Sequence, residues 1–274
     1  MPAGWLAWTR LRQVARGYTR KRFSDAQLLS RTWWLIVIVV FGVLQCSGST
    51  RSWLIVAATA TSLFAFAPVS DMLLSRLRQT ADQPVNLLLL RVFGYTARTE
   101  RLFDRICGRW RLLGPVTMIA APDVVARTIA PGDYLRWLTG RVDELFVNTQ
   151  ADLIAKLSAF DAAPDPDGRY RINAFCCRSG TWQATVVELI QRADAVVMDL
   201  RGLTRARHGC EFELQELRRR LPLQKLVLVV DATTERAIFD ETFGQQSNSV
   251  RLVEVRRSRN IGAVLEALVS AAAA

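Results

Sequence analysis

The fold is decided by the stretch Asp194-Ala-Val-Val-Met-Asp-Leu200, the polar loop 201–208 after it, and then Gly209-Cys-Glu-Phe-Glu-Leu-Gln-Glu-Leu217. Four apolar residues between two aspartates predict a short buried strand, and the Glu/Leu spacing after the loop predicts a helix. A polar loop at the carboxyl end of a strand is where an open parallel sheet binds ligands. We therefore expect Glu211 and Glu213, in the first turn of that helix, to face a pocket. Acidic residues also favour a first turn because they complement the helix dipole, and this alternative stays open.

The same alternation of apolar runs and amphipathic segments extends over residues 84–274. Strands are expected at 85–90, 115–121, 170–177, 195–200, 225–230 and 250–255, and helices at 97–110, as a pair within 133–160, and at 181–192, 209–220, 234–243 and 260–271. The short runs are continuously apolar, as in strands that are buried on both faces. The sequence predicts an α/β fold with an open, mostly parallel sheet of about five or six strands.

Composition and charge indicate a membrane partner. Of the 274 residues 50% are hydrophobic, and the formal net charge is +11. The segment 1–31 holds seven basic residues against Asp25 alone, a net charge of +6. A basic tail beside an apolar run is typical of a membrane surface. No nucleic-acid partner is expected, because no aromatic-interleaved basic strand or zinc-finger spacing accompanies the charge.

The first 83 residues predict a membrane anchor. Segment 1–31 places tryptophans and leucines among arginines at near-helical spacing, the pattern of a basic amphipathic helix at a bilayer surface. Two uncharged runs follow, at about 32–48 and 53–70, and each approaches the ~17–25 residues that cross a bilayer. Together with a connector they predict a two-helix transmembrane hairpin over 32–83. A buried helical hairpin in a soluble protein is the competing interpretation.

The charges that flank the two runs predict the orientation of the hairpin. The turn 47–52 holds one basic residue, whereas the outer flanks hold Lys21, Arg22 and Arg31 on one side and Arg76 and Arg78 on the other. Because basic flanks stay on the cytoplasmic side, both termini are expected in the cytoplasm. The predicted location is the inner (plasma) membrane, crossed more than once, with the 84–274 domain in the cytosol.

Familiar catalytic motifs do not occur in the chain. There is no GxGxxG, no GxxxxGK[ST] and no GxSxG sequence, and the single histidine is His208. The five cysteines include no CxxC pair, so we expect reduced thiols and no metal site.

Polar residues follow the predicted strands at their carboxyl ends. They are Arg91 and Tyr95, Asp123, Arg178 and Ser179, Asp199 and Arg201, and Asp231. Because the carboxyl ends of parallel strands lie at one edge of a sheet, we expect these residues to converge on one pocket with Glu211 or Glu213. Arginine would hold a phosphate, and a carboxylate would hold ribose hydroxyls or stabilise an oxocarbenium-like centre. The expected ligand is therefore nucleotide-like.

Three stretches resemble a known group of domains. They are the strand, polar loop and Gly-x-Glu-x-Glu-Leu motif that end at Leu214, the segment Val187-Glu-Leu-Ile-Gln-Arg-Ala-Asp-Ala-Val-Val197 with Trp182 before it, and the opening Leu87-Leu-Leu-Leu-Arg-Val-Phe-Gly-Tyr95. They are similar to TIR-like and nucleoside-deoxyribosyltransferase-like Rossmannoid domains, including membrane-anchored bacterial proteins. The resemblance covers roughly residues 85–245 and implies a flavodoxin-like or TIR-like sheet. It also implies a catalytic glutamate that cleaves an N-glycosidic bond, a position that Glu213 fits best and Glu211 second.

Two functions follow from these expectations. One is a membrane-anchored cytosolic signalling or interaction module that senses a nucleotide or self-associates, which the resemblance connects with stress or phage defence. The other is an NAD or nucleoside N-glycosidase that uses Glu213, with Arg91 or Arg178 on the phosphate. No resident cofactor is assigned, and NAD or another nucleotide is the expected ligand or substrate. The predicted ligand-binding residues are Arg91, Tyr95, Arg178, Asp199 and Arg201.

Overall fold

The computed structural model describes residues 3–44, 83–91, 97–120, 131–178, 180–255 and 261–274, together with Leu54, Ala57, Ala58, Thr61, Ser62 and Val69. The chain divides into two compact units. The first comprises Met1–Thr80, Ile129–Val142 and Pro164–Arg169, and the second comprises Ala81–Thr128, Asp143–Ala163 and Tyr170–Ala274. The first unit thus includes a segment from the middle of the chain that the sequence analysis grouped with the α/β fold.

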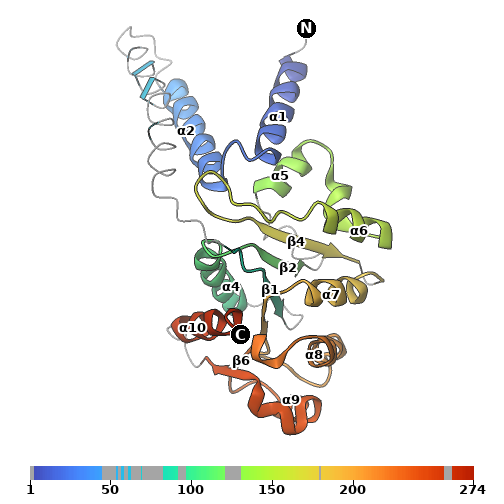
Figure 1. Cartoon of the computed structure of the whole chain (residues 1–274). Coiled ribbons are helices and arrows are strands. Elements are labelled where there is room, and N and C mark those ends of the chain that lie inside the picture. The colour runs from blue at the N-terminus through green and yellow to red at the C-terminus, as the bar shows by residue number, and fades with distance from the viewer. Residues whose placement is uncertain are drawn as a thin grey trace. The chain divides into compact units, whose positions relative to one another are not determined.

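Three helices form the described core of the first unit. They are α1 (Ala3–Thr19), α2 (Asp25–Leu44) and α5 (Pro131–Leu138), and Figure 1 shows α5 beside the ends of α1 and α2 that face each other. Tyr18, Phe23 and Leu135 make the buried cluster between them. The packing is close, because a Cβ on Gly132 would come within 2.5 Å of the Tyr18 ring.

The helix α2 begins at Asp25, several residues before the uncharged run from which a helix was predicted. Ser24 and Gln27 form a reciprocal cap: the Gln27 amide nitrogen donates to Ser24 Oγ at 3.3 Å, and the Ser24 amide nitrogen donates to Gln27 Oε1 at 2.7 Å. This arrangement is a capping box, which satisfies two amides that the first turn leaves without partners. The apolar part of α2 is therefore preceded by a polar turn.

Among the described residues, α2 is the one helix long and apolar enough to cross a membrane, and very little of it is buried. Trp33 and Val39, for example, are 66% and 62% exposed. The second predicted span, 53–70, lies outside the described residues except for six helical positions, and the connector lies outside them up to residue 82. The structure thus supports a single apolar helix, and the two-helix hairpin stays a prediction.

The second unit is built on an open sheet of seven strands, ordered β3-β4-β2-β1-β5-β6-β7. The strands are β1 (Leu87–Arg91), β2 (Val116–Ala120), β3 (Phe146–Val147), β4 (Ile172–Cys177), β5 (Ala195–Asp199), β6 (Leu226–Val230) and β7 (Arg251–Glu254). Every described pairing is parallel. The predicted α/β fold with an open parallel sheet is confirmed, but the sheet has one or two strands more than expected.

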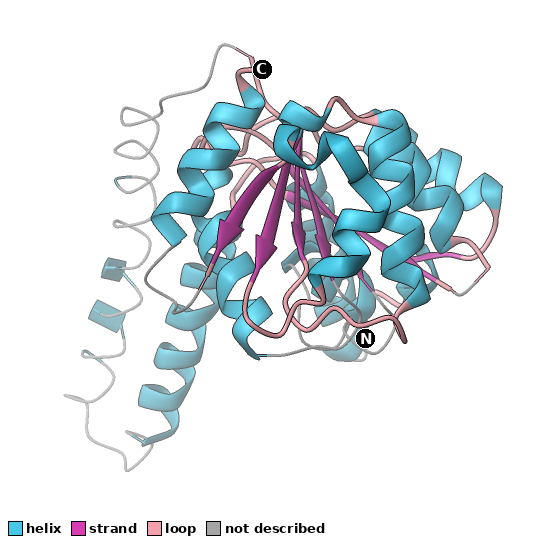
Figure 2. Cartoon of the chain, turned by 90° about the horizontal axis from the view of Figure 1, so that it is seen from below, coloured by secondary structure: helices cyan, strands magenta, loops and turns pink. Residues whose placement is uncertain are grey.

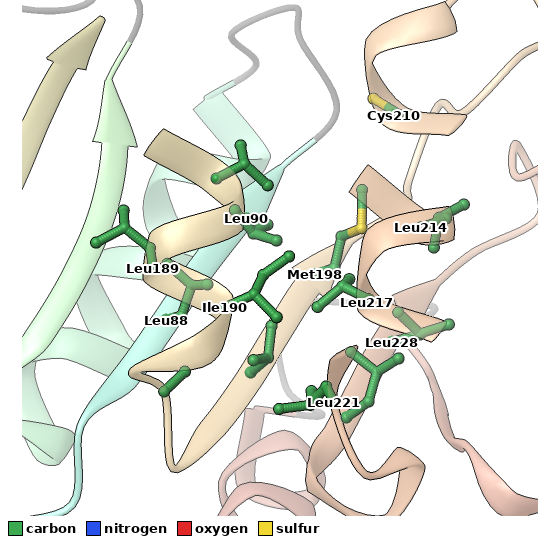
Figure 3. Packing of buried hydrophobic residues seen from close by; sticks show 14 of the residues in the cluster. Leu88, Leu90, Leu189, Ile190, Met198, Cys210, Leu214, Leu217, Leu221 and Leu228 are labelled. Carbon is green, nitrogen blue, oxygen red and sulfur yellow. The ribbon is translucent and has the colours of Figure 1, made fainter. Parts of the chain in front are cut away.

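Helices cover both faces of this sheet (Figure 2). One face carries α6 (Gln150–Ser158), α7 (Trp182–Gln191), α8 (His208–Arg220) and α9 (Arg236–Phe243), and the other carries α4 (Ala97–Trp110) and α10 (Ile261–Ala272). Short 3-10 turns lie at Val142–Leu145, Leu223–Lys225 and Gly244–Ser249. Successive side chains of a strand point to opposite faces, so Leu88 belongs to the buried cluster with residues of α6, α7, α8 and α9, whereas Leu89 belongs to the cluster with residues of α4 and α10. Figure 3 shows the strand residue Met198 beside Leu217 of α8 within this cluster.

The extra strand β3 lies in the segment 133–160, which the sequence predicted as two helices. The two helices exist as α5 and α6, but Phe146 and Val147 between them pair with Cys176 and Cys177 of β4. A two-residue strand shows no periodicity, so the helical pattern on either side conceals it.

Candidate functional site

A topological switch point lies between the neighbouring parallel strands β1 and β5. After β1 and β2 the chain places β3 at the edge of the sheet and then β4 between β3 and β2, and it returns to place β5 on the other side of β1. Connections leave in opposite directions at such a switch point, which is where open α/β sheets bind ligands. Arg91 and Asp199, the last residues of β1 and β5, are register partners there.

Asp199 and Arg201 form a buried bidentate pair at this edge. Nε of Arg201 donates to Asp199 Oδ1 at 2.8 Å, and Nη2 donates to Oδ2 at 2.7 Å. Asp199 is only 1% exposed, and its hydrogen bonds to Arg201 raise the pKa of the guanidinium above its usual value. The carboxylate is therefore neutralised in place, and the guanidinium is held in one orientation.

Arg201 also reaches the beginning of α4. Its Nη2 donates to the main-chain carbonyl oxygen of Arg98 at 3.4 Å, whereas its Nη1 makes no hydrogen bond to the described residues. The amides of a helix N-terminus and a guanidinium nitrogen without a partner both favour an anion. The α4 side of the edge thus has the polarity that a phosphate group needs.

A network of main-chain and hydroxyl contacts fixes the loop after β5. The Gly202 amide donates to Thr233 Oγ1 at 3.0 Å, and Thr233 in turn donates to Asp231 Oδ1 at 2.5 Å. Thr234 Oγ1 donates to the carbonyl oxygen of Leu200 at 3.1 Å. Gly202 has φ of 74°, a left-handed conformation in which other residues are strained. The loops after β5 and β6 therefore hold each other in place beside Arg201.

Glu213 lies in the second turn of α8, on the opposite side of the sheet from the Asp199–Arg201 pair. Asp199 has the strand parity of Ala195 and Val197, which pack under α4 and α10, whereas α8 covers the other face. Glu213 is 2% exposed, and burial raises its pKa to about 8. Its Oε2 has no hydrogen-bond partner among the described residues. Beside it, Trp182 of α7 meets Phe212 edge to face, with ring centroids 5.3 Å apart.

Glu211 occupies a different environment from Glu213. Two residues along a helix turn the side chain by about 200°, so the two glutamates point in nearly opposite directions. Glu211 lines a surface hollow of about 540 Å³ between α8 and α9, together with Arg205, Arg218 and Glu241. Charges in this hollow are partly paired already, because Arg205 bonds Glu241. Glu211 thus lies in the first turn and lines a hollow, as expected from the sequence, whereas Glu213 lies in the second turn and is directed to another side of the helix.

The other predicted site residues divide into two groups. Arg91, Asp199, Arg201 and Asp231 lie at the ends of the neighbouring strands β1, β5 and β6. Arg178 is exposed at the end of β4, three strand spacings from β5, or about 14 Å. Tyr95, Asp123 and Ser179 lie outside the described residues. The strand ends of β1, β5 and β6 thus bring Arg91, Asp199, Arg201 and Asp231 to one edge of the sheet, Arg178, Glu211 and Glu213 lie elsewhere, and the common pocket stays a prediction.

Sequence reasoning missed the two threonines that fix the edge. Thr233 and Thr234 follow Asp231 directly, and the Thr233 amide donates to Asp231 Oδ1 at 2.9 Å. An aspartate followed by threonines at the end of a strand is a local turn signal, because its side chain accepts from the amide two residues on. Read in that way, the sequence Asp231-Ala-Thr-Thr234 would have indicated an ordered loop at this edge.

No family model, curated protein or solved structure matches this chain. The assignment of the site therefore rests on its own geometry and chemistry.

The buried cysteines are poor candidates for reactive thiols. Cys107, Cys176, Cys177 and Cys210 are buried, and none of the four is in a disulfide. Burial raises the pKa of Cys107 to about 12 and also raises the pKa of Cys177. A raised pKa keeps a thiol protonated, and a protonated thiol is a much weaker nucleophile than a thiolate. These side chains therefore act mainly as small apolar residues. Within the described part of the chain, no three His, Cys, Asp or Glu residues come together as a metal-ligand set.

Proposed function

We propose that the chain is a membrane-anchored signalling or interaction module of TIR-like type, whose α/β unit binds a nucleotide-type ligand at the switch point between β1 and β5. The observation that carries the proposal is the juxtaposition of Arg91 with the buried Asp199–Arg201 pair on the two central strands. The motif that ends in Glu213-Leu214, described above as a resemblance, supports the TIR-like assignment.

The chemistry of the edge suits a phosphate-bearing ligand. Arg91 and Arg201 place two guanidinium groups beside Asp199 on the ends of the same two strands. The N-terminus of α4, next to Arg201, adds the favourable end of a helix dipole. The carboxylate of Asp231 can accept hydrogen bonds from ribose hydroxyls.

Membrane anchoring is the second part of the proposal. It is supported by the exposed apolar surface of α2 and by the basic residues of the preceding segment. The proposed arrangement is the predicted one: a hairpin in the plasma membrane, with both termini and the α/β unit in the cytoplasm. A topology reporter fused after Gly48 should then be found outside the cytoplasm. The same reporter fused at the C-terminus should be found in the cytoplasm. Cytoplasmic activity of the Gly48 fusion would contradict the hairpin.

Ligand binding is tested on the full chain in lipid nanodiscs, titrated with NAD, ATP, AMP and unphosphorylated adenosine. Arg91→Gln removes one charge-assisted hydrogen bond, worth roughly 1.5–3 kcal/mol, so we expect at least about tenfold weaker binding of the phosphorylated ligands. Arg219→Gln is the matched control, because it makes the same change in charge at a side chain that is 68% exposed on α8. Equal affinities of the two variants, or no binding of any nucleotide by the wild type, would contradict the proposal.

A second candidate is the NAD or nucleoside N-glycosidase that uses Glu213. The specific observation in its favour is a buried carboxyl with one oxygen without a partner and a pKa of about 8, which is protonated at neutral pH and so able to act as a general acid. Burial opposes this role, because a side chain that is 2% exposed is not accessible to a substrate unless the structure around it opens.

The glycosidase is tested by incubating the full chain at high concentration with NAD and with nucleosides. Release of nicotinamide or free base by the wild type, absent in Glu213→Gln, would establish the enzyme. Glu211→Gln is the control, because Glu211 lies on the α9 side of the same helix and its loss should leave any turnover unchanged. If the wild type binds nucleotide but releases no product, the glycosidase is excluded and the signalling or interaction module remains as the proposed function.

A further inference from the structure

The helix α5 presents an aromatic surface that the sequence analysis did not single out. Tyr134 and Trp137 stack with ring centroids 5.7 Å apart, and they are 51% and 55% exposed. Leu138, next to them, is 37% exposed. Two large aromatic side chains stacked in the open are unusual on a surface that faces only water, because each keeps apolar area exposed.

Another side of α5 packs against the helix that carries the apolar run. Leu135 is buried with Tyr18 and Phe23, and Leu28 of α2 packs against this cluster. The Tyr18 hydroxyl donates to Asp25 Oδ1 at 2.5 Å, which ties the end of α1 to the first residue of α2. Within this unit α5 therefore lies at the polar base of α2, just before the uncharged run (Figure 1).

The depth of α5 can be estimated from α2. Five residues separate Leu28, which contacts the α5 cluster, from Trp33, which is 66% exposed at the start of the apolar run. At a rise of 1.5 Å per residue, these positions are about 7.5 Å apart along the helix axis. A bilayer is thicker than its hydrocarbon core by the two interfacial regions. Half of that difference, about 7 Å, is the thickness of the interfacial region on one side. If the apolar run enters the hydrocarbon at Trp33, α5 lies at the level of the headgroups.

We infer that α5 is a second membrane contact of this chain, with Tyr134 and Trp137 inserted in the headgroup region of an anionic bilayer. Aromatic residues with polar edges concentrate in this region. The exposed arginines of α1, including Arg12 and Arg16, belong to the same unit and match anionic headgroups. The inference rests on the membrane anchoring by α2 proposed above.

The test places an environment-sensitive fluorophore on single cysteines in the full chain, reconstituted in vesicles of phosphatidylcholine and phosphatidylglycerol. Cys46 is replaced by serine, and the four described cysteines are buried. The labelled variants are Trp137→Cys on α5, Val39→Cys on α2, and Val269→Cys on α10, a site 51% exposed and so comparable with Trp137. Quenching is measured with aqueous iodide and with lipids that carry a nitroxide near the headgroup or deep in the acyl chain.

The inference predicts that the label at 137 is blue-shifted relative to the label at 269, protected from iodide, and quenched more by the shallow nitroxide than by the deep one. The label at 39 should be quenched more by the deep nitroxide. Quenching at 39 without lipid quenching at 137 would overturn the inference and leave the anchor standing. Iodide protection at 137 without lipid quenching would indicate a protein partner, such as a second copy of the chain, and would also overturn it. Absence of lipid quenching at 39 would refute the anchor itself, and the inference with it.

Discussion

Two carboxyl groups are buried on opposite faces of one sheet, and they are accommodated in opposite ways. Asp199 is 1% exposed and is held by two hydrogen bonds from Arg201. Glu213 is 2% exposed, its Oε2 has no partner among the described residues, and its pKa is raised to about 8. Burial is therefore nearly equal, and the difference lies in the partner.

This difference separates a charged site from a neutral one. A buried carboxylate with a bidentate arginine can keep its charge, because the hydrogen bonds replace those that it made with water. A buried carboxyl without such a partner avoids the cost of desolvating a charge by keeping its proton. The face of α4 and α10 thus holds fixed charges for a ligand, whereas the face of α8 holds a protonated acid.

The largest expected effect is the pH dependence that Glu213 gives to stability. Its pKa rises from the ordinary value of 4.5 to about 8 on folding, so the folded state binds more protons than the unfolded state between these values. The stabilisation is complete below about pH 4.5 and is lost as the pH rises through about 8, in total on the order of 5 kcal/mol. Urea unfolding of the full chain in detergent micelles between pH 5 and 8.5 measures it.

The neutral variant Glu213→Gln provides the control for this pH series. Other groups titrate in the same range in both proteins, so the difference between the two stability curves isolates Glu213. We expect the wild type to lose stability relative to Glu213→Gln as the pH increases. Parallel curves would show that Glu213 is ionised in the folded state, and the contrast with Asp199 would then be wrong.

Removal of Arg201 should turn Asp199 into an unpaired buried charge. Arg201→Met is expected to lower the free energy of unfolding by about 3–5 kcal/mol at neutral pH, because breaking a buried pair leaves one ion uncompensated. The double variant Asp199→Asn with Arg201→Met should recover part of this loss, which the same urea unfolding measures. A single variant as stable as the wild type would mean that Arg201 does not neutralise Asp199.

A smaller effect is expected from Thr233, which connects the two loops beside the pair. Thr233→Val keeps the shape of the side chain but removes the hydroxyl that bonds Gly202 and Asp231, at a cost of about 1 kcal/mol. Hydrogen exchange of the Gly202 amide should become faster, while amides in the middle of β5 should not change. Unchanged exchange at Gly202 would show that the loop is held by other contacts.

The smallest effect is expected from the Arg205–Glu241 pair, the exposed counterpart of the Asp199–Arg201 pair. Both side chains are 60% exposed, and solvent screens such contacts. Glu241→Gln should leave the urea midpoint unchanged within error. A clear loss of stability would mean that the surface between α8 and α9 is more constrained than its exposure indicates.

The sheet was largely predictable because its strands are buried on both faces. The runs Leu87–Arg91, Ala195–Asp199 and Leu226–Val230 contain few polar residues, and each lies between amphipathic segments. The strand β3 was not predictable, because two residues carry no period. The membership of α5 in the first unit was also beyond the sequence, since it depends on the contact of Leu135 with Tyr18, which is far away in the chain.

The site was predictable only where strand ends determine it. Arg91 and Asp199 come together because parallel strands in register bring their ends to the same edge. The separation of Glu213 from them could not be deduced, because the face that a helix covers depends on the path of the connection and not on its local pattern. Residue types also gave no sign that Glu213 Oε2 lacks a partner among the described residues, since that depends on which side chains pack around it in the fold.

The measurement that tests the central claim most directly is hydrogen exchange of the full chain in nanodiscs, with and without NAD and ATP. The account predicts ligand-dependent protection at 97–103 and 199–204, next to Arg98 and Arg201, and little change at 182–190 and 208–216. Protection confined to the segments around Glu213, or no protection by any nucleotide at concentrations that saturate binding, would contradict it.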